Sequence, residues 1–202
     1  MIAIIDYDAG NLRSVQKALH FLGQDAVISR DHKDLIAADK VILPGVGAFG
    51  DAMDKLKSYQ LIGTIKEIVD SGKPLLGICL GQQLLFEGSS ESEGVEGLSL
   101  LPGMIQRIPH KEGLKIPHIG WNSLEISEDA TLYRGLSGKP YVYFVHSYYL
   151  DSEDRSMVAA TTEYGVRIDA SVERGNIYGC QFHPEKSGEV GLNILKSFAT
   201  LL

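Results

Sequence analysis

Residues 74–83 read PLLGICLGQQ, and this stretch decides how the chain is expected to fold. Its first part, Pro74–Ile78, is a short apolar run of the kind found in buried parallel strands. Glycines on both sides of Cys79 form the pattern G-x-C-x-G, which is the pattern of a nucleophile elbow with cysteine in place of serine. The stretch therefore predicts a strand, a strained turn that projects the Cys79 side chain above the sheet, and a helix over about Leu80–Glu87.

Apolar runs and helical periodicity alternate through the first half of the chain. The short apolar runs predict three further strands, and helix-spaced apolar residues predict the segments between them. The expected strands are Ile2–Ile5, Ala26–Ser29 and Val41–Leu43; the expected helices are one capped by Asn11, one over about Asp31–Ala37, and one over about Phe49–Val69 with a break near Tyr59–Gln60. Alternation of this kind indicates a mostly parallel sheet with helices on both faces.

Strands and turns dominate the second half. The expected strands are Ile105–Ile108, Tyr141–Val145, Met157–Thr162, Ile168–Val172 and Ile177–Gln181. They favour an antiparallel extension of the sheet, followed by a last helix from about Gly188 with Leu202 on its apolar face. The expected fold is therefore a three-layer α/β fold, and the length of 202 residues predicts a single domain over residues 1–202.

Composition narrows the class of protein further. The chain has 19 Lys and Arg against 26 Asp and Glu, a net charge of −7, which argues against a nucleic-acid or anionic-membrane surface. Its apolar runs are far shorter than the roughly 18 residues of a membrane-spanning helix, and its N-terminus lacks the basic flank of a signal peptide. With only two cysteines, Cys79 and Cys180, we expect a cytoplasmic protein with free thiols.

A glycine-rich loop, PGVGAFG at residues 44–50, contains G-x-G-x-x-G after a strand and before a helix. That is the fingerprint of dinucleotide binding, but the fingerprint also needs an acidic residue at the end of the next strand to hold a ribose. Here that residue is Cys79, so a nicotinamide-binding or regulatory module is the weaker hypothesis, and we expect no cofactor. Two interpretations stay open: a tight turn, or a loop whose bare N–H groups approach a ligand.

A histidine and a glutamate, His183 and Glu185, follow the last predicted strand. Pro184 between them favours an extended His183, and side chains two apart in an extended chain share a side. Glu185 can then lie beside the His183 ring, fix its tautomer and stabilise its charged form. A structural role is the alternative for both groups. A lone histidine is more often a surface or core residue, and Cys79 can also be a buried structural thiol. We interpret Cys180, which lies on the strand itself, as a core residue.

Metal sites are not expected. The six histidines show neither H-x-x-x-H nor C-x-x-C spacing. The acidic run Glu91–Glu96 lacks the alternating ligands of a calcium loop. It lies in Gly88–Gly97, which we predict to be a mobile solvated loop from which Glu91 can reach a nearby pocket.

In combination, GICLGQQ at residues 77–83 and HPE at residues 183–185 resemble the triad-type (class I) glutamine amidotransferases. Longer strings at residues 44–53, 117–122, 143–149 and 181–187 resemble the glutaminase subunits of imidazole glycerol phosphate synthase, in histidine biosynthesis. The resemblance runs in order from the first strand to the last helix. It departs at Gln82, where that family often has Met, and in the loop after Gly88.

The resemblance implies a class I glutamine amidotransferase fold and a cysteine mechanism. Cys79 would attack the side-chain amide carbon of L-glutamine, and His183, oriented by Glu185, would protonate the departing ammonia and then activate water. The N–H of Leu80, at the start of the helix, and that of Val46 would hold the oxyanion. By the same resemblance a set of pocket residues would bind glutamine: Gly45, Gly47, Gln83, Glu91, His146, Ser147 and Tyr148.

No part of the sequence offers a site for a phosphorylated acceptor of the ammonia. The resemblance implies that a partner supplies it, a (β/α)₈-barrel cyclase subunit that forms imidazole glycerol phosphate and aminoimidazole carboxamide ribonucleotide. The expected docking residues of this heterodimer are Asn11, Trp121, Tyr143 and Lys186. The alternative keeps the triad and assigns a different acceptor, in an anthranilate, purine or pyridoxal phosphate pathway.

Overall fold

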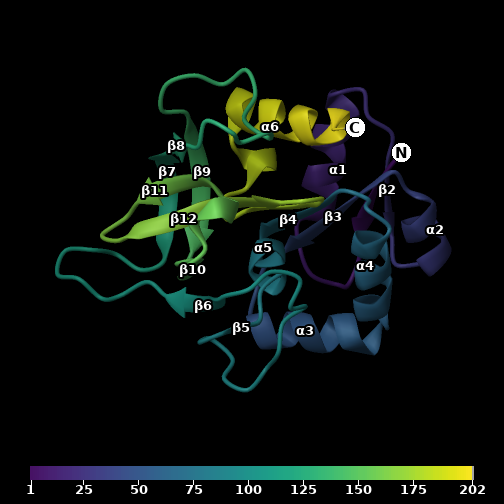
Figure 1. The fold of residues 1–202 in the computed structure, drawn as a ribbon, viewed down its shortest axis with the longest axis horizontal. Coiled ribbons are helices and arrows are strands. Elements are labelled where there is room, and N and C mark those ends of the chain that lie inside the picture. Colours follow the sequence, from purple (N-terminus) through teal and green to yellow (C-terminus); the bar gives the residue numbers. More distant parts are fainter. Residues whose placement is uncertain (202) are drawn as a thin grey trace.

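An eight-stranded sheet forms the middle layer of the computed structural model, which describes residues 1–201 (Figure 1). Its parallel part has the order β2 (Ala26–Ser29), β1 (Ile2–Ile5), β3 (Lys40–Gly45), β4 (Leu75–Cys79) and β13 (Ile177–Cys180). The antiparallel strands β12 (Arg167–Arg174), β11 (Val158–Glu163) and β8 (Glu125–Ile126) extend it. The expected mostly parallel sheet with an antiparallel extension is confirmed.

Helices cover both faces of this sheet. On one face lie α1 (Leu12–Phe21) and α6 (Gly188–Thr200), and on the other lie α2 (His32–Ala37), α3 (Phe49–Ser58), α4 (Leu61–Asp70) and α5 (Leu80–Leu84) (Figure 1). Successive residues of β1 point to opposite faces, so Ile2 and Ile4 join one core and Ala3 and Ile5 the other. Burial on both faces explains why β1 is apolar at every position.

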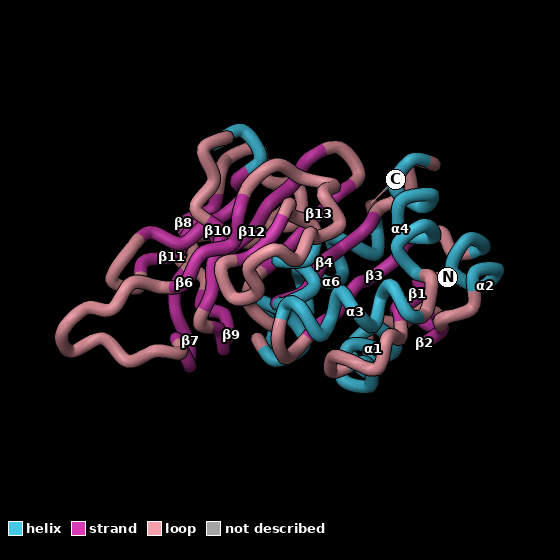
Figure 2. Tube along the Cα trace, turned by 90° about the horizontal axis from the view of Figure 1, so that it is seen from below, coloured by secondary structure: helices cyan, strands magenta, loops and turns pink. Residues whose placement is uncertain are grey.

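Two smaller sheets stand beside the central one. One consists of β10 (Tyr148–Leu150), β6 (Met104–Arg107) and β5 (Gly88–Ser89), and the other is a ribbon of β7 (His118–Ser123) and β9 (Tyr141–His146). Figure 2 places β6, β7 and β9 at the end of the molecule opposite β1, β2 and α2. The ribbon is attached to the chain after β13, because the His183 N–H donates to the Tyr143 carbonyl at 3.0 Å.

Several expectations about local structure were incomplete. The strand β7 was not predicted, since its residues HIGWNS include Gly120 at φ +132° and show no clear apolar alternation. The helix expected to reach Glu87 ends at Leu84, whose carbonyl is bonded by the returning chain at Leu98. The side chain of Asn11 does not cap α1. The predicted position of Leu202 lies outside the described residues.

The segment Gly88–Gly97 is tied to the rest of the protein at several points. The Phe49 N–H donates to the Glu91 carboxylate at 2.8 Å, and the Gly50 N–H donates to the Ser92 hydroxyl at 3.0 Å. At its end, the Gly97 N–H donates to the Glu87 carbonyl. The segment thus fastens the start of α3.

None of the helices within residues 1–201 is both long and apolar enough to cross a lipid bilayer.

The turn between β4 and α5 requires glycine at position 81, and this requirement can be tested. A Cβ atom on Gly81 would fall on the Leu43 carbonyl of β3. We expect Gly81→Ala to lower the free energy of unfolding by about 1–3 kcal/mol in urea denaturation, as overpacking does. The control is Gly63→Ala, because Gly63 is exposed in α4 with open space around it and should gain up to about 1 kcal/mol. Equal effects of the two substitutions would contradict this account.

Candidate active site

Cys79 lies at the end of β4 in a strained backbone conformation. Its φ of +55° and ψ of −110° are rare for a residue with a side chain. The turn is tight enough that a Cβ on Gly77 would lie 2.7 Å from the backbone of Gly81 and Gln82. The predicted sharp turn is therefore present, and it presents the nearly buried Cys79 sulfur at the carboxyl edge of the parallel strands.

His183 and Glu185 face each other directly after β13. Nδ1 of His183 lies 2.9 Å from Oε1 of Glu185, and both side chains are almost fully buried, at 2% and 1% exposure. The chain reaches this arrangement differently from the expectation, since His183 is extended but Pro184–Lys186 form a 3₁₀ turn. Proline suits the first position of such a turn because it needs no N–H partner there.

A buried serine fixes this turn. The Ser187 hydroxyl donates to the His183 carbonyl at 2.6 Å and accepts the Tyr143 N–H of β9 at 3.0 Å. Asn11 approaches Glu185 from the start of α1, with Nδ2 3.5 Å from Oε1. The histidine–glutamate pair is thus held from β9 on one side and from α1 on the other.

The charge on His183 is set by its two neighbours. Burial alone would lower the pKa of His183, but the Cys79 thiol and the Glu185 carboxylate outweigh it and raise that pKa to about 9. Because Glu185 occupies Nδ1, the buried Nε2 atom is the one left to face the sulfur. At neutral pH the imidazole is therefore protonated between a sulfur and a carboxylate.

A cavity of about 470 Å³ opens over Cys79, a size that suits a small-molecule ligand. It brings together most of the residues that the sequence singled out: Val46, Gly47, Cys79, Leu80, Gln83, Glu91, His146, Ser147, Tyr148, His183 and Lys186. Pro117 and Val145 also line it. Glu185 lies behind His183, and Asn11, Trp121 and Tyr143 are not among the lining residues.

The glycine loop after β3 forms one wall of this cavity. Val46 is 45% exposed, and Gly47 has a φ of +101°, which favours glycine. Gly45 lies beneath it, where a Cβ would be 2.5 Å from the Tyr7 hydroxyl and 2.9 Å from the Gly81 nitrogen. Of the two open interpretations, this position at the cavity wall favours a loop that approaches a ligand.

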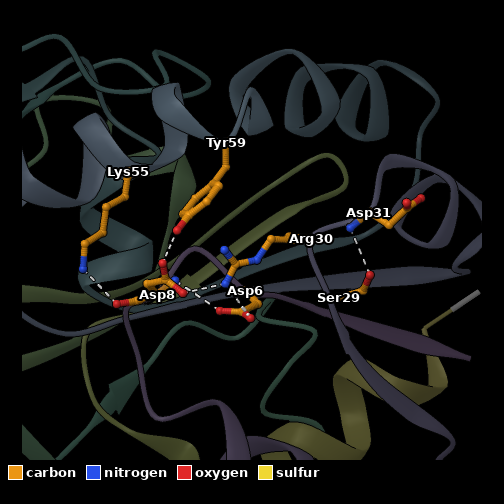
Figure 3. A network of polar contacts seen from close by, with 7 residues as sticks. All are labelled: Asp6, Asp8, Ser29, Arg30, Asp31, Lys55 and Tyr59. Atoms are coloured by element: carbon orange, nitrogen blue, oxygen red, sulfur yellow. Dashed lines mark hydrogen bonds and ion pairs between the residues drawn. The ribbon is translucent and has the colours of Figure 1, made fainter.

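A clamp of polar residues holds the neighbouring loop between β1 and α1 (Figure 3). Arg30 donates to Asp6 at 2.8 Å and to Asp8 at 2.5 Å, while Lys55 donates to the Asp8 carbonyl at 2.8 Å and Tyr59 to its carboxylate. Asp8 itself has a positive φ of 59°.

The clamped loop contacts two parts of the site. Its Tyr7 hydroxyl donates to the Pro44 carbonyl at 2.8 Å, next to the glycine loop. Its last residue, Asn11, approaches Glu185. The clamp of Asp6, Asp8 and Arg30 therefore supports the glycine loop and the glutamate from outside the cavity.

His146 belongs to a chain of hydrogen bonds behind the cavity wall. A backbone carbonyl only accepts, so Nδ1 of His146 donates to the Tyr148 carbonyl at 2.8 Å, and its Nε2 accepts from Nδ1 of His118 at 3.0 Å. Burial lowers the pKa of His146 to about 3 and that of His118 to about 4. Both rings are neutral at physiological pH, and His146 supports the cavity through the protein rather than with a free ring nitrogen.

Gln181 is the site residue that sequence reasoning missed. Its buried side chain lies with Nε2 3.7 Å from the Cys79 sulfur and with Oε1 2.9 Å from Nε2 of Gln83. One pattern could have found it, because Gln181 lies two residues before His183 and so shares a side with it in an extended chain.

A strained cysteine at a strand end, paired with a histidine and a glutamate on a three-layer α/β fold, is the arrangement of a triad-type amidotransferase. The chain belongs to the class-I glutamine amidotransferase family, whose family model matches residues 3–201. Within it, the chain is 51% identical over 198 residues to imidazole glycerol phosphate synthase subunit HisH of Bacillus cereus (strain ATCC 14579), covering 98% of this chain and 93% of that protein. It is also 51% identical over 201 residues to subunit HisH of Moorella thermoacetica, covering 100% and 95%.

Solved structures agree on the fold. A crystal structure of a glutamine amidotransferase matches with a TM-score of 0.76 at 20% identity, over 98% of this chain and 99% of that one. PurLQS from Thermotoga maritima matches with a TM-score of 0.73 at 23% identity, over 98% and 96%. The resemblance drawn from the motifs and the expected class I fold are both confirmed.

The dependence of His183 on Glu185 gives a prediction. We expect Glu185→Gln to lower the pKa of His183 from about 9 by at least about one unit, because the carboxylate is one of the two groups that raise it. The measurement is an NMR titration of the imidazole nitrogens. Glu189→Gln, an exposed glutamate at the start of α6, is the control and should leave that pKa in place. A titration curve that Glu185→Gln does not move would contradict the assignment.

Proposed function

We propose that this chain hydrolyses L-glutamine to L-glutamate and ammonia and is the glutaminase subunit of imidazole glycerol phosphate synthase in histidine biosynthesis. The main support is the arrangement of three side chains: Cys79 and His183 line the cavity, and Glu185 bonds His183 from the interior side. Support also comes from HisH relatives at about half identity over nearly the whole chain. The expected single domain over residues 1–202 and a cytoplasmic location are part of the proposal.

The first half-reaction breaks the C–N bond of the glutamine side chain. The Cys79 thiolate attacks the side-chain amide carbon of glutamine and forms a tetrahedral intermediate. His183, protonated at neutral pH because its pKa is about 9, donates a proton to the leaving nitrogen, and the C–N bond breaks. Ammonia and a γ-glutamyl thioester result, and His183 is left neutral.

The second half-reaction reverses these roles. Neutral His183 takes a proton from water, the resulting hydroxide attacks the thioester carbon, and the C–S bond breaks to give glutamate and the thiolate. Glu185, at 2.9 Å from Nδ1, stabilises the imidazolium each time it forms. No cofactor is needed for either step.

Two backbone N–H groups would stabilise the negative oxygen of both tetrahedral intermediates. The N–H of Leu80 begins the first turn of α5, where no earlier carbonyl of the helix is available to it. The second is that of Val46 on the exposed glycine loop. Because one such donor is worth about 10²–10³ in turnover, the position of this loop would control the rate.

The remaining cavity residues fit the α-amino and α-carboxylate groups of glutamine. Glu91 is held at the rim by the Phe49 N–H, which leaves a carboxylate near the mouth for an ammonium group. Gly47, Ser147 and Tyr148 also line the cavity and offer backbone and hydroxyl groups, with the glycine at position 45 and His146 as support.

A partner subunit would consume the ammonia, and the proposed partner is a (β/α)₈-barrel cyclase. The β7–β9 ribbon exposes large apolar side chains beside the cavity, with Ile119, Trp121 and Tyr141 at 56–59% exposure. Trp121 also contacts Tyr143 edge to face. We propose this face, together with Asn11 at the start of α1 and the exposed Lys186 beside the cavity, as the heterodimer interface.

Removal of the proposed nucleophile tests the activity. We expect Cys79→Ala to abolish glutamine hydrolysis while synthesis from added ammonia by the complex with the cyclase continues, because the substitution leaves the partner's chemistry intact. The assay is glutamate release beside product formation. Cys180→Ala, which removes the other buried thiol, is the control and should keep glutamine hydrolysis. Glutamine hydrolysis by folded Cys79→Ala would overturn the proposal.

Removal of the exposed Trp121 side chain tests whether the ribbon face binds the cyclase subunit. We expect Trp121→Ala to weaken binding of the cyclase subunit by about 30-fold in isothermal titration calorimetry, which corresponds to about 2 kcal/mol for an interface aromatic. Phe21→Ala is the matched control, because Phe21 is 79% exposed at the far end of α1. If the chain instead binds a synthase of the anthranilate, purine or pyridoxal phosphate pathway and ignores the cyclase, the alternative assignment replaces this one.

A further inference from the structure

Gln181 presents a buried amide to the sulfur of Cys79. Its side chain is fully buried directly after β13, and its backbone N–H donates to the Ala170 carbonyl of β12 at 2.8 Å. Nε2 of this side chain lies 3.7 Å from the Cys79 sulfur, within hydrogen-bond range for sulfur. The amide therefore reaches the reacting atom itself.

The orientation of this amide follows from its neighbours. Nε2 of Gln83 donates to the Tyr148 carbonyl at 3.0 Å and to Oε1 of Gln181 at 2.9 Å. A backbone carbonyl can only accept, so the amide nitrogen of Gln83 must lie on that side. Gln181 then turns its oxygen to Gln83, and only its N–H₂ group remains for the sulfur.

A thiolate at this position needs such a donor, because a buried charge is costly unless it is paired and hydrogen-bonded. The Val145 carbonyl, 3.9 Å from the sulfur, is an acceptor and can bond only the protonated thiol. Of the titratable groups that surround the sulfur, His183 is the cationic one within the buried site.

The other titratable groups near Cys79 carry no positive charge into the buried site. Burial raises the pKa of Tyr7 and that of Cys180, so both stay protonated, and His146 is neutral. The Glu185 carboxyl lies behind His183, while Glu91 and Lys186 line the cavity. Tyr7, Cys180 and neutral His146 direct their protons to the carbonyls of Pro44, Gly77 and Tyr148, whereas the Gln181 amide directs its N–H to the Cys79 sulfur.

We propose that Gln181 is a catalytic residue whose side-chain amide donates a hydrogen bond to the Cys79 thiolate, with Gln83 as the positioning residue that fixes the direction of that donor. The inference rests on the proposed function, in which Cys79 is the nucleophile. It assigns the amide pair Gln83–Gln181 a task apart from glutamine binding: to keep the sulfur anionic and aimed before substrate arrives.

The test measures the reactivity of the sulfur without glutamine. In full-length Cys180→Ala protein, we expect Gln181→Met to slow alkylation of Cys79 by iodoacetamide about tenfold at pH values below the midpoint of the alkylation profile. The midpoint of the alkylation pH profile should rise by about one unit, since each unit changes the thiolate fraction tenfold. Gln181→Glu, which places a carboxylate beside the sulfur, should raise the midpoint further. In both variants kcat for glutamine hydrolysis should fall by a larger factor than KM changes.

A neighbouring glutamine provides the control. Gln82 is also fully buried, yet within residues 1–201 neither its Nε2 nor its Oε1 has a hydrogen-bond partner. Gln82→Met makes the same change of side chain one residue away from Gln83 and should leave the alkylation midpoint and kcat unchanged. A general loosening of the core would move both variants alike.

Two outcomes overturn the inference: a folded Gln181→Met protein with an unshifted midpoint, or equal shifts in Gln181→Met and Gln82→Met. If Gln181→Met does not fold, Gln83→Met decides in its place, because freeing the amide of Gln181 should raise the midpoint in the same direction, and an unmoved midpoint refutes the proposal. Failure of the proposed function is recognised separately, by glutamine hydrolysis in Cys79→Ala.

Discussion

The conformation of Cys79 is the constraint on which the rest of the structure depends. A positive φ at a residue with a side chain costs of order 1–3 kcal/mol, so the surroundings must hold it. Glycines on both sides remove every Cβ that would collide with the turn, and α5 approaches β3 so closely that Gly81 lies against the Leu43 carbonyl. The same closeness makes Gly45 necessary beneath the glycine loop. One strained residue thereby determines the side chains allowed on three neighbouring segments.

Buried charge is the second requirement, and the site meets it by pairing. Burial opposes the protonation of His183, yet a carboxylate on one nitrogen and a sulfur near the other raise its pKa to about 9. His118 and His146 show the opposite case, since neither is bonded to a carboxylate and burial lowers the pKa of each. Histidines buried in one small region thus differ by several units because of the charges beside them, which is how a protein separates a proton donor from a structural support.

Particular residues show how far the sequence could predict this structure. Apolar runs located the parallel strands because burial on both faces forces every position to be apolar, and the glycine pattern located Cys79 because the turn admits no larger residue. The ribbon strand β7 was missed since it is half exposed and contains Gly120, so neither apolar runs nor alternation mark it. Gln181 was missed because its partner Cys79 lies 102 residues away in the chain. Its spacing from His183 indicates only that the two side chains share a side, and does not identify the contact with the sulfur.

The β7–β9 ribbon connects the proposed docking face with the proposed catalytic site. The backbone of Tyr143 on β9 accepts from the His183 N–H and donates to Ser187, while the side chains of the same ribbon form the exposed apolar face. A subunit that packs on that face would therefore press on the strand that holds the histidine. Coupling between docking and catalysis needs a physical element that both can shift. Here that element is the two-stranded ribbon of β7 and β9, which lies outside the central sheet and contacts both the proposed docking face and the histidine.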